Sequence, residues 1–188
     1  MRRASVLLSA AVVACGVVLP ARAQVLLERT GGTFVSTSAL GGEGSPGTNV
    51  GVHVSHRFGR AIDATVGGLY IDPTGEVDAE ARLGATHRFG DAWGLRAEAA
   101  ARVSTAGRPS GPFGGRLDAS GGVFRAVPLS EHVTAYPTLE ARSWYGFDYG
   151  LSIPFVATVS KLVQAGLSAR VGINSPVLFT YTVQTRLR

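Results

Sequence analysis

The chain has 188 residues, of which 45% are hydrophobic and 16% are charged, and its formal net charge is +5 at pH 7. More than half of that positive excess comes from Arg2, Arg3 and Arg22, so the rest of the chain is too weakly basic to predict nucleic-acid binding. The length predicts one domain, and the single cysteine, Cys15, excludes a disulfide framework.

The first 23 residues predict a secretory signal peptide. Two arginines precede an apolar run over residues 4–19, and Ala21-Arg22-Ala23 offers the small residues of a cleavage site before Gln24. The run is short for a membrane-spanning helix, which favours removal over anchoring. Lipidation of Cys15 is a second interpretation, because Val12-Val13-Ala14-Cys15 resembles a lipoprotein box. The prediction is therefore a signal peptide over 1–23 and one domain over 24–188.

From there to the C-terminus the sequence alternates between apolar and polar residues with a period of two, which predicts β-strands. We expect about ten strands: 32–40, 48–58, 61–71, 76–89, 93–104, 115–127, 133–145, 149–159, 162–173 and 177–187. Glycine-rich loops over 41–47 and 106–115 belong to a set of longer connections, which alternate with very short turns. Eight strands is the alternative count.

One sequence, His-Arg-Phe-Gly, occurs twice, at His56–Gly59 and at His87–Gly90. If each copy ends a strand and opens a three-residue turn, the flanking strands pair apolar with apolar and polar with polar residues. The same test works at two later turns. The expected opposite pairs are Phe58 with Ile62, Arg57 with Asp63, Phe89 with Trp93, Glu80 with Arg102, Val127 with Val133, Asp118 with Arg142, and Phe124 with Tyr136. The repeat thus indicates a duplicated hairpin corner more strongly than a duplicated site.

The apolar face of these strands is rich in alanine and the polar face carries opposite charges, which predicts a closed barrel with a polar lumen and a lipid-facing exterior. The expected lumen charge network is Arg57, Asp63, Glu80, Arg82, Arg96, Glu98, Arg102, Asp118, Glu140, Arg142 and Arg170. Two aromatic girdles are expected at the membrane interfaces, formed by Phe58, Phe89, Trp93, Tyr70, Tyr145, Tyr149, Phe179 and Tyr181. The fold class is thus all-β, a closed antiparallel up-and-down transmembrane barrel.

This pattern resembles the bacterial outer-membrane β-barrel superfamily, and in particular its small members with eight to ten strands. The resemblance implies a location in the outer membrane, contact with its lipid and lipopolysaccharide, and periplasmic chaperones and the barrel-assembly machinery as partners during biogenesis. It also implies termini and short turns in the periplasm. Many such barrels end in an aromatic residue, whereas this chain ends in Leu187-Arg188. A soluble secreted sandwich is the alternative fold, but the sequence lacks its long runs of bulky core residues.

Three histidines were considered as candidates for chemistry. His56 and His87 fall on the outward face beside the turns, where a pair at equivalent corners would not converge on a metal. His53 faces inward, with Ser55 on the same strand, and is the better catalytic candidate, but membership of a polar network is the favoured interpretation. We therefore predict no catalytic residues, no metal and no cofactor.

The predicted function is structural or interactive: a small, monomeric outer-membrane barrel whose lumen is packed with ion pairs, since a barrel of this size is only wide enough for its own side chains. A narrow channel for small solutes is the first alternative. An outer-membrane lipid-modifying hydrolase that uses His53 is the second.

Overall fold

The structure is a computed structural model that describes residues 31–42, 49–71, 75–104, 115–143, 147–175 and 177–187. The predicted signal peptide with Cys15, most of both glycine-rich loops and the predicted girdle residue Tyr145 lie outside the described residues.

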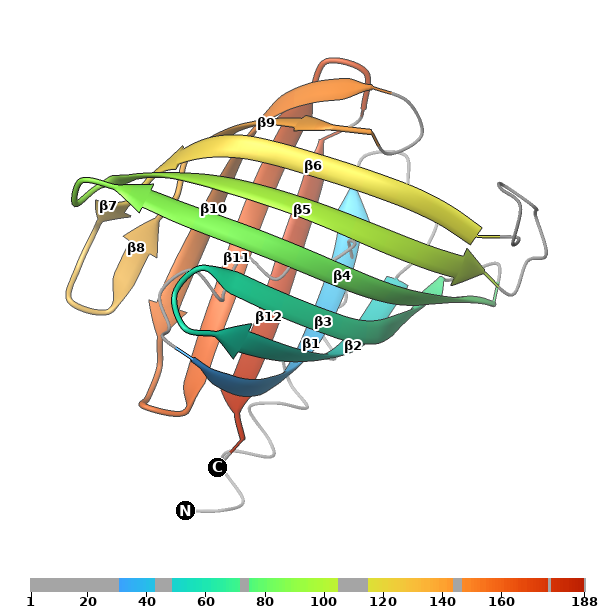
Figure 1. Cartoon of the computed structure of the whole chain (residues 1–188), viewed down its shortest axis with the longest axis horizontal. Helices are drawn as coiled ribbons and strands as arrows, with labels where there is room; N and C mark the ends of the chain where they lie inside the picture. The colour runs from blue at the N-terminus through green and yellow to red at the C-terminus, as the bar shows by residue number, and fades with distance from the viewer. Residues whose placement is uncertain are drawn as a thin grey trace.

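All regular structure in the described chain is antiparallel sheet (Figure 1). The strands are β1 (Gly32–Gly42), β2 (Asn49–Phe58), β3 (Ile62–Ile71), β4 (Glu76–Phe89), β5 (Trp93–Ser104), β6 (Gly115–Arg125), β7 (Val127–Pro128), β8 (Val133–Ala135), β9 (Thr138–Arg142), β10 (Asp148–Thr158), β11 (Val163–Gly172) and β12 (Leu178–Arg186). Among the described residues no helix is long and apolar enough to span a bilayer.

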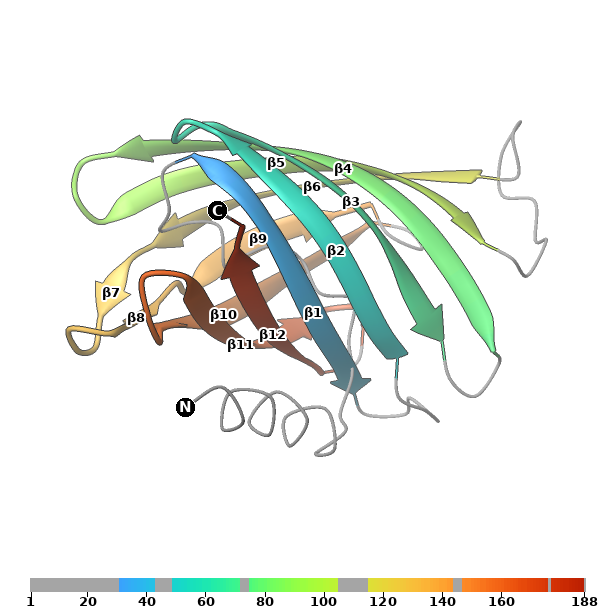
Figure 2. The same ribbon diagram turned by 90° about the horizontal axis from the view of Figure 1, so that it is seen from below.

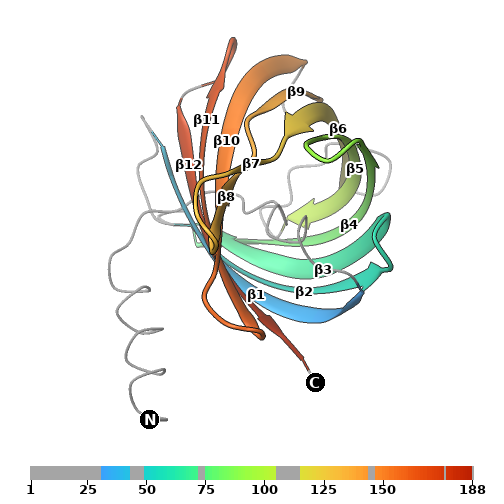
Figure 3. The same cartoon turned by 90° about the vertical axis from the view of Figure 1, so that its left-hand side faces the viewer.

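The sheet closes on itself because β1 pairs with β12 and β11 pairs with both β10 and β12. β7 continues β6 beyond Ala126, and β8 and β9 both pair with β10, so the twelve segments form ten barrel strands. The ring of strands is visible end-on in Figure 3, and their tilt around the barrel in Figure 2. The all-β, closed, antiparallel fold with ten strands rather than eight is confirmed.

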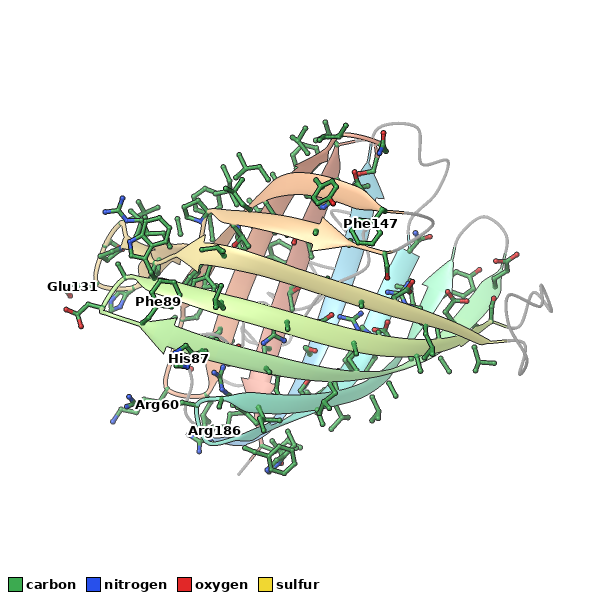
Figure 4. All side chains as sticks on the ribbon, turned by 45° about the horizontal axis from the view of Figure 1, so that its top comes forward. Arg60, His87, Phe89, Glu131, Phe147 and Arg186 are labelled. Atoms are coloured by element: carbon green, nitrogen blue, oxygen red, sulfur yellow. The ribbon has the colours of Figure 1, made fainter. Side chains whose placement is uncertain are left out.

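The two ends of the barrel differ. The short turns lie at one end together with Arg186 near the C-terminus, as the labels Arg60, Glu131 and Arg186 show in Figure 4. Phe147, which precedes β10, lies at the opposite end. We call these the short-turn end and the loop end.

The duplicated His-Arg-Phe-Gly segments are strand ends and corners. Gly59 and Gly90 both have positive φ angles, 65° and 69°, which L side chains rarely adopt. Phe58 lies opposite Ile62 and Phe89 opposite Trp93, and the predicted pairs Arg57–Asp63 and Glu80–Arg102 follow in the same registers. The predicted register of these two hairpins is therefore confirmed.

The predicted register of the third hairpin is wrong, because each residue pairs with a partner two positions further along the chain than expected. Val127 lies opposite Ala135, not Val133, and Arg142 lies opposite Ser120, not Asp118. The turn begins one residue later than expected, because the Leu129 N–H donates to the Val133 carbonyl at 2.9 Å. Phe124 consequently lies opposite Thr138 rather than Tyr136.

The strand predicted over 133–145 is also interrupted. Tyr136 and Pro137 lie outside any strand, and β8 and β9 flank them. Proline has no N–H to contribute to a sheet ladder, which explains a break at this point. The Pro137 carbonyl still accepts a hydrogen bond from the Arg125 N–H at 3.0 Å, so the wall remains connected across the break.

Burial alternates along the strands, and the faces are inverted relative to a soluble protein. β2 shows this clearly, since Val52 and Val54 are exposed whereas His53 and Ser55 are buried. Exposed large hydrophobic side chains occur on strands around the barrel, while polar side chains outnumber hydrophobic ones among the buried residues described. An apolar exterior and a polar interior are what a barrel requires when its solvent is lipid.

Candidate functional site in the barrel lumen

The lumen is lined by ionised side chains that the alternation of β2–β6 points inward. Arg96 on β5 holds Asp63 on β3 with two parallel hydrogen bonds, at 2.8 Å to Oδ1 and 3.0 Å to Oδ2. The same guanidinium donates to Thr86 Oγ1 at 2.9 Å and to Glu98 Oε2 at 3.2 Å. A planar guanidinium that uses both edges in this way ties strands together with defined geometry.

Glu80 on β4 is the central acceptor of this wall. Its Oε1 contacts His53 Nε2 at 2.7 Å and accepts a short hydrogen bond from Arg82 Nη2, while its Oε2 lies 3.2 Å from Arg102 Nε. Arg82 also lies 3.8 Å from Glu98, and Arg102 lies 3.7 Å from Asp118 on β6. One continuous chain of opposite charges therefore links β2 to β6, and we call it the β2–β6 network.

A second group of ion pairs, the β9–β11 cluster, lies on another part of the lumen wall. Glu140 Oε1 lies 2.5 Å from both Arg142 Nη2 and Arg170 Nε, and Arg170 Nη2 lies 2.6 Å from Asp148 Oδ2. Ser175 donates to Asp148 at 2.7 Å, and the Asn174 N–H donates to its other oxygen at 3.0 Å. The cluster thereby fixes the turn after β11 to the start of β10 at the loop end.

Glycines make room for these large groups. A Cβ atom on Gly84 would lie 2.5 Å from Arg96 Nη2 and 2.6 Å from Asp63 Oδ2, so this position must lack a side chain for the bidentate pair to form. At Gly67 a Cβ would lie 2.3 Å from the His53 ring, and at Gly94 it would lie 2.3 Å from Phe124. Small residues facing large ones fill a narrow barrel without voids.

The remaining part of the lumen, on β1, β11 and β12, carries neutral polar groups. Buried hydroxyl and amide side chains here are Ser36, Ser38, Gln164, Ser168, Thr182 and Gln184. Gln164 and Gln184 lie opposite each other, and within the described chain neither Oε1 atom has a hydrogen-bond partner. Ser152 Oγ on β10 is fully buried and equally unpartnered there. Such groups are ordinarily satisfied by water or by a ligand.

An apolar cluster inside the barrel connects β6, the Tyr136–Pro137 break and β10. Phe124, Tyr136 and Val156 are each 1% exposed, and the two rings meet edge to face with centroids 5.9 Å apart. The guanidinium of Arg88 lies 5.9 Å from the Phe124 ring. Because Arg88 is two residues before the Gly90 corner and Phe124 lies opposite Gly94 beside the same turn, we call this cluster the apolar plug of the short-turn end.

The structure brings most of the predicted lumen residues together, but Arg57 is an exception. It is buried opposite Asp63, yet Arg96 holds that carboxylate, and Arg57 Nη2 instead donates to the Arg60 carbonyl at 2.6 Å. Its Nε and Nη1 atoms have no hydrogen-bond partner among the described residues.

The predicted girdle residues within the described chain face outward. Phe58, Tyr70, Phe89, Trp93, Tyr149 and Phe179 are exposed, and Tyr181 is half-buried. His56 and His87 are also exposed, and His56 Nδ1 lies 2.9 Å from Thr33 Oγ1. The described residues contain no group of three or more histidine, cysteine or acidic side chains placed to hold a metal ion.

Sequence reasoning did not include Asp148 in the lumen network, whereas for His53 it favoured a polar network over a catalytic role. His53 is 3% exposed and belongs to the β2–β6 network through Glu80. Asp148 was missed because the expected strand began one residue later, at Tyr149. Extending the period-two alternation back from Ser152 through Gly150 would have placed Asp148 on the inward face. The same alternation would have placed Phe124 of the apolar plug inside the barrel, because Phe124 shares its face of β6 with Asp118.

Solved structures of a porin share this fold. A KdgM porin in complex with disordered oligogalacturonate matches with a TM-score of 0.58 at 8% sequence identity, over 82% of this chain and 99% of that chain. A second structure of KdgM porin gives a TM-score of 0.57 at 9% identity over the same shares. No protein-family model matches the chain, and no curated protein sequence does. At this identity the likeness concerns the fold alone, a closed antiparallel β-barrel.

Proposed function

We propose that this protein is a membrane-spanning barrel of the bacterial outer membrane whose lumen is closed, and whose role is structural or interactive. The observation that carries the proposal is the burial of balanced charge. Five arginines and six carboxylates of the two lumen groups face inward together with Arg57, and Glu80, Arg82 and Arg170 are each below 8% exposed. A water-filled pore would leave its lining side chains accessible to water.

The apolar plug supports the same proposal from a different direction. Phe124, Tyr136 and Val156 place apolar surface inside the barrel near the short-turn end, where water gains no hydrogen bonds. A hydrophobic constriction of this kind blocks ion flow even where its radius would admit an ion. We expect this apolar surface to complete the closure that the ion pairs begin.

A narrow channel for small solutes is the second candidate. It is supported by the fold likeness to a porin and by the unpartnered oxygens of Ser152, Gln164 and Gln184, which leave hydrogen-bonding capacity on one wall. Transfer of acidic sugar oligomers, which the matched porin binds, would require unpaired cations, whereas most lumen arginines here contact carboxylates. A lipid hydrolase that uses His53 receives less support, because His53 is buried in the lumen and bonded to Glu80.

Conductance in planar bilayers tests the closed lumen. We expect the refolded chain to be silent, and the double substitution Phe124→Ala with Tyr136→Ala to raise conductance above the background of the unmodified chain. The matched control is Phe58→Ala with Phe89→Ala, which removes two outward rings and should leave the barrel silent. Steady conductance of the unmodified chain would contradict the proposal and favour the channel.

Location and insertion have a separate test. A chain in the outer membrane should sediment with that fraction and migrate faster in unboiled than in boiled detergent samples, because a closed sheet resists the detergent. Recovery in the soluble fraction with one heat-independent mobility would contradict the membrane assignment.

A further inference from the structure

Arg125 stands out on the outer surface of the barrel. Strand alternation points it outward with Leu117 and Val123 of β6, and it is exposed. At every other outward-facing strand position in the described chain, the side chain is uncharged or a histidine. A lone ionised residue on a surface that faces lipid is costly and usually marks a functional contact.

The partners of Arg125 make the position more specific. It lies directly opposite Trp93, and its guanidinium lies 5.6 Å from the centre of the Trp93 ring. No carboxylate of the described chain forms an ion pair with it. Trp93 in turn lies opposite Phe89, so the cation sits within the aromatic girdle of the short-turn end. Stacking on indole orients the guanidinium and leaves its N–H donors available.

We propose that Arg125 and Trp93 form a binding site for the phosphate of an anionic phospholipid. This inference rests on the proposed membrane-spanning function. Phosphate oxygens accept two parallel hydrogen bonds from guanidinium, and the negative charge complements a cation that no carboxylate of the described chain neutralises. The indole ring holds its apolar edge among the acyl chains and its polar edge at the headgroups, which places the site at the correct depth.

Trp93 supplies the probe for a test. The chain has two tryptophans, Trp93 and Trp144, so Trp144→Phe leaves Trp93 as the only indole. This variant is refolded into phosphatidylcholine vesicles that contain a minor fraction of a brominated quencher lipid, either phosphatidylglycerol or phosphatidylcholine. We expect quenching to report an apparent affinity about fivefold higher for the anionic quencher, the factor typical of one basic residue near an anionic surface.

Arg125→Gln in the same background should remove that preference and leave quenching by the neutral lipid unchanged. The matched control is Arg60→Gln, which removes one exposed cation from a turn at the same end and should keep the preference. Heat-modifiable mobility verifies that each variant is folded.

The outcomes separate the two proposals. Equal quenching by both lipids in the Trp144→Phe chain would overturn the site while leaving the membrane barrel intact. Equal loss of preference in the Arg60 and Arg125 variants would show general surface charge rather than a site. Absence of quenching by either lipid would overturn the membrane-spanning function itself.

Discussion

Glu80 concentrates the energetics of the lumen in one carboxylate. It receives His53, Arg82 and Arg102, and its side chain is 4% exposed. Removing one partner of a buried ion pair leaves an uncompensated charge in a medium of low polarity, which costs far more than the intact pair contributes. The network therefore constrains substitution even if its net stabilisation is small.

Glu80→Gln should lower the free energy of unfolding by about 3–5 kcal/mol, because it leaves Arg82 and Arg102 with one fewer counterion at nearly constant volume. Urea-induced unfolding from lipid vesicles measures the change. Glu76→Gln, near the loop end of the same strand, is the control and should cost much less.

Restoring charge balance should recover part of the loss. In Glu80→Gln with Arg82→Gln, Glu98 keeps its contact with Arg96, so no lumen carboxylate loses all of its cations. If the double variant were less stable than Glu80→Gln alone, charge balance would not be the controlling quantity.

At this scale the sequence predicted which residues meet because alternation and hairpin counting fix the face of each side chain. It placed Glu80 opposite Arg102, as the structure shows. It could not show that Arg96, rather than Arg57, would hold Asp63. That choice depends on side-chain reach across two strands and on the space left by Gly84.

At the scale of the element, each hairpin corner depends on one backbone conformation. Gly59 and Gly90 start equivalent turns with nothing within 4 Å of the position a Cβ would occupy. Any penalty for a side chain there is therefore conformational rather than steric. The repeated sequence records this shared requirement.

Gly90→Ala should destabilise the barrel by about 1–2 kcal/mol, the cost of the left-handed conformation for an L residue. Gly90→Asn should recover part of the loss, since asparagine tolerates this region better than alanine. The same vesicle unfolding experiment gives both values. Equal stability of the alanine variant and the unmodified chain would contradict the assigned φ angle.

The third hairpin shows where sequence reasoning on elements stops. A register shift that pairs each residue with one two positions further along keeps every side chain on its face, so alternation cannot detect it. The first two corners are fixed by a glycine at the start of the turn, whereas the segment from Leu129 to Val133 has none. The break at Pro137 further separates the turn from the strand that would otherwise define its register.

At the scale of the whole molecule, stability depends on closure of the sheet. β12 pairs with β1 over nine residue pairs and with β11 over eight, so the last strand joins the first and completes the ring. Without it, two long edges would present unpaired N–H and C=O groups to lipid, each at considerable cost.

A chain truncated before β12, ending at residue 176, should therefore lack the fast-migrating folded form in unboiled detergent samples. The untruncated chain, refolded in parallel, is the control. A truncated chain that still shifted its mobility on boiling would mean that the remaining strands close without β12.

Glycines lie beside the bulky lumen side chains, so the wall of this barrel and its bore depend on different parts of the chain. The strands are held by backbone ladders, while large side chains enter the bore where Gly67, Gly84 and Gly94 leave room for them. Exchange of a few interior residues during evolution can therefore convert such a protein between a closed barrel and an open channel without altering the number of strands. Two proteins with superimposable walls can then differ completely in what they let through.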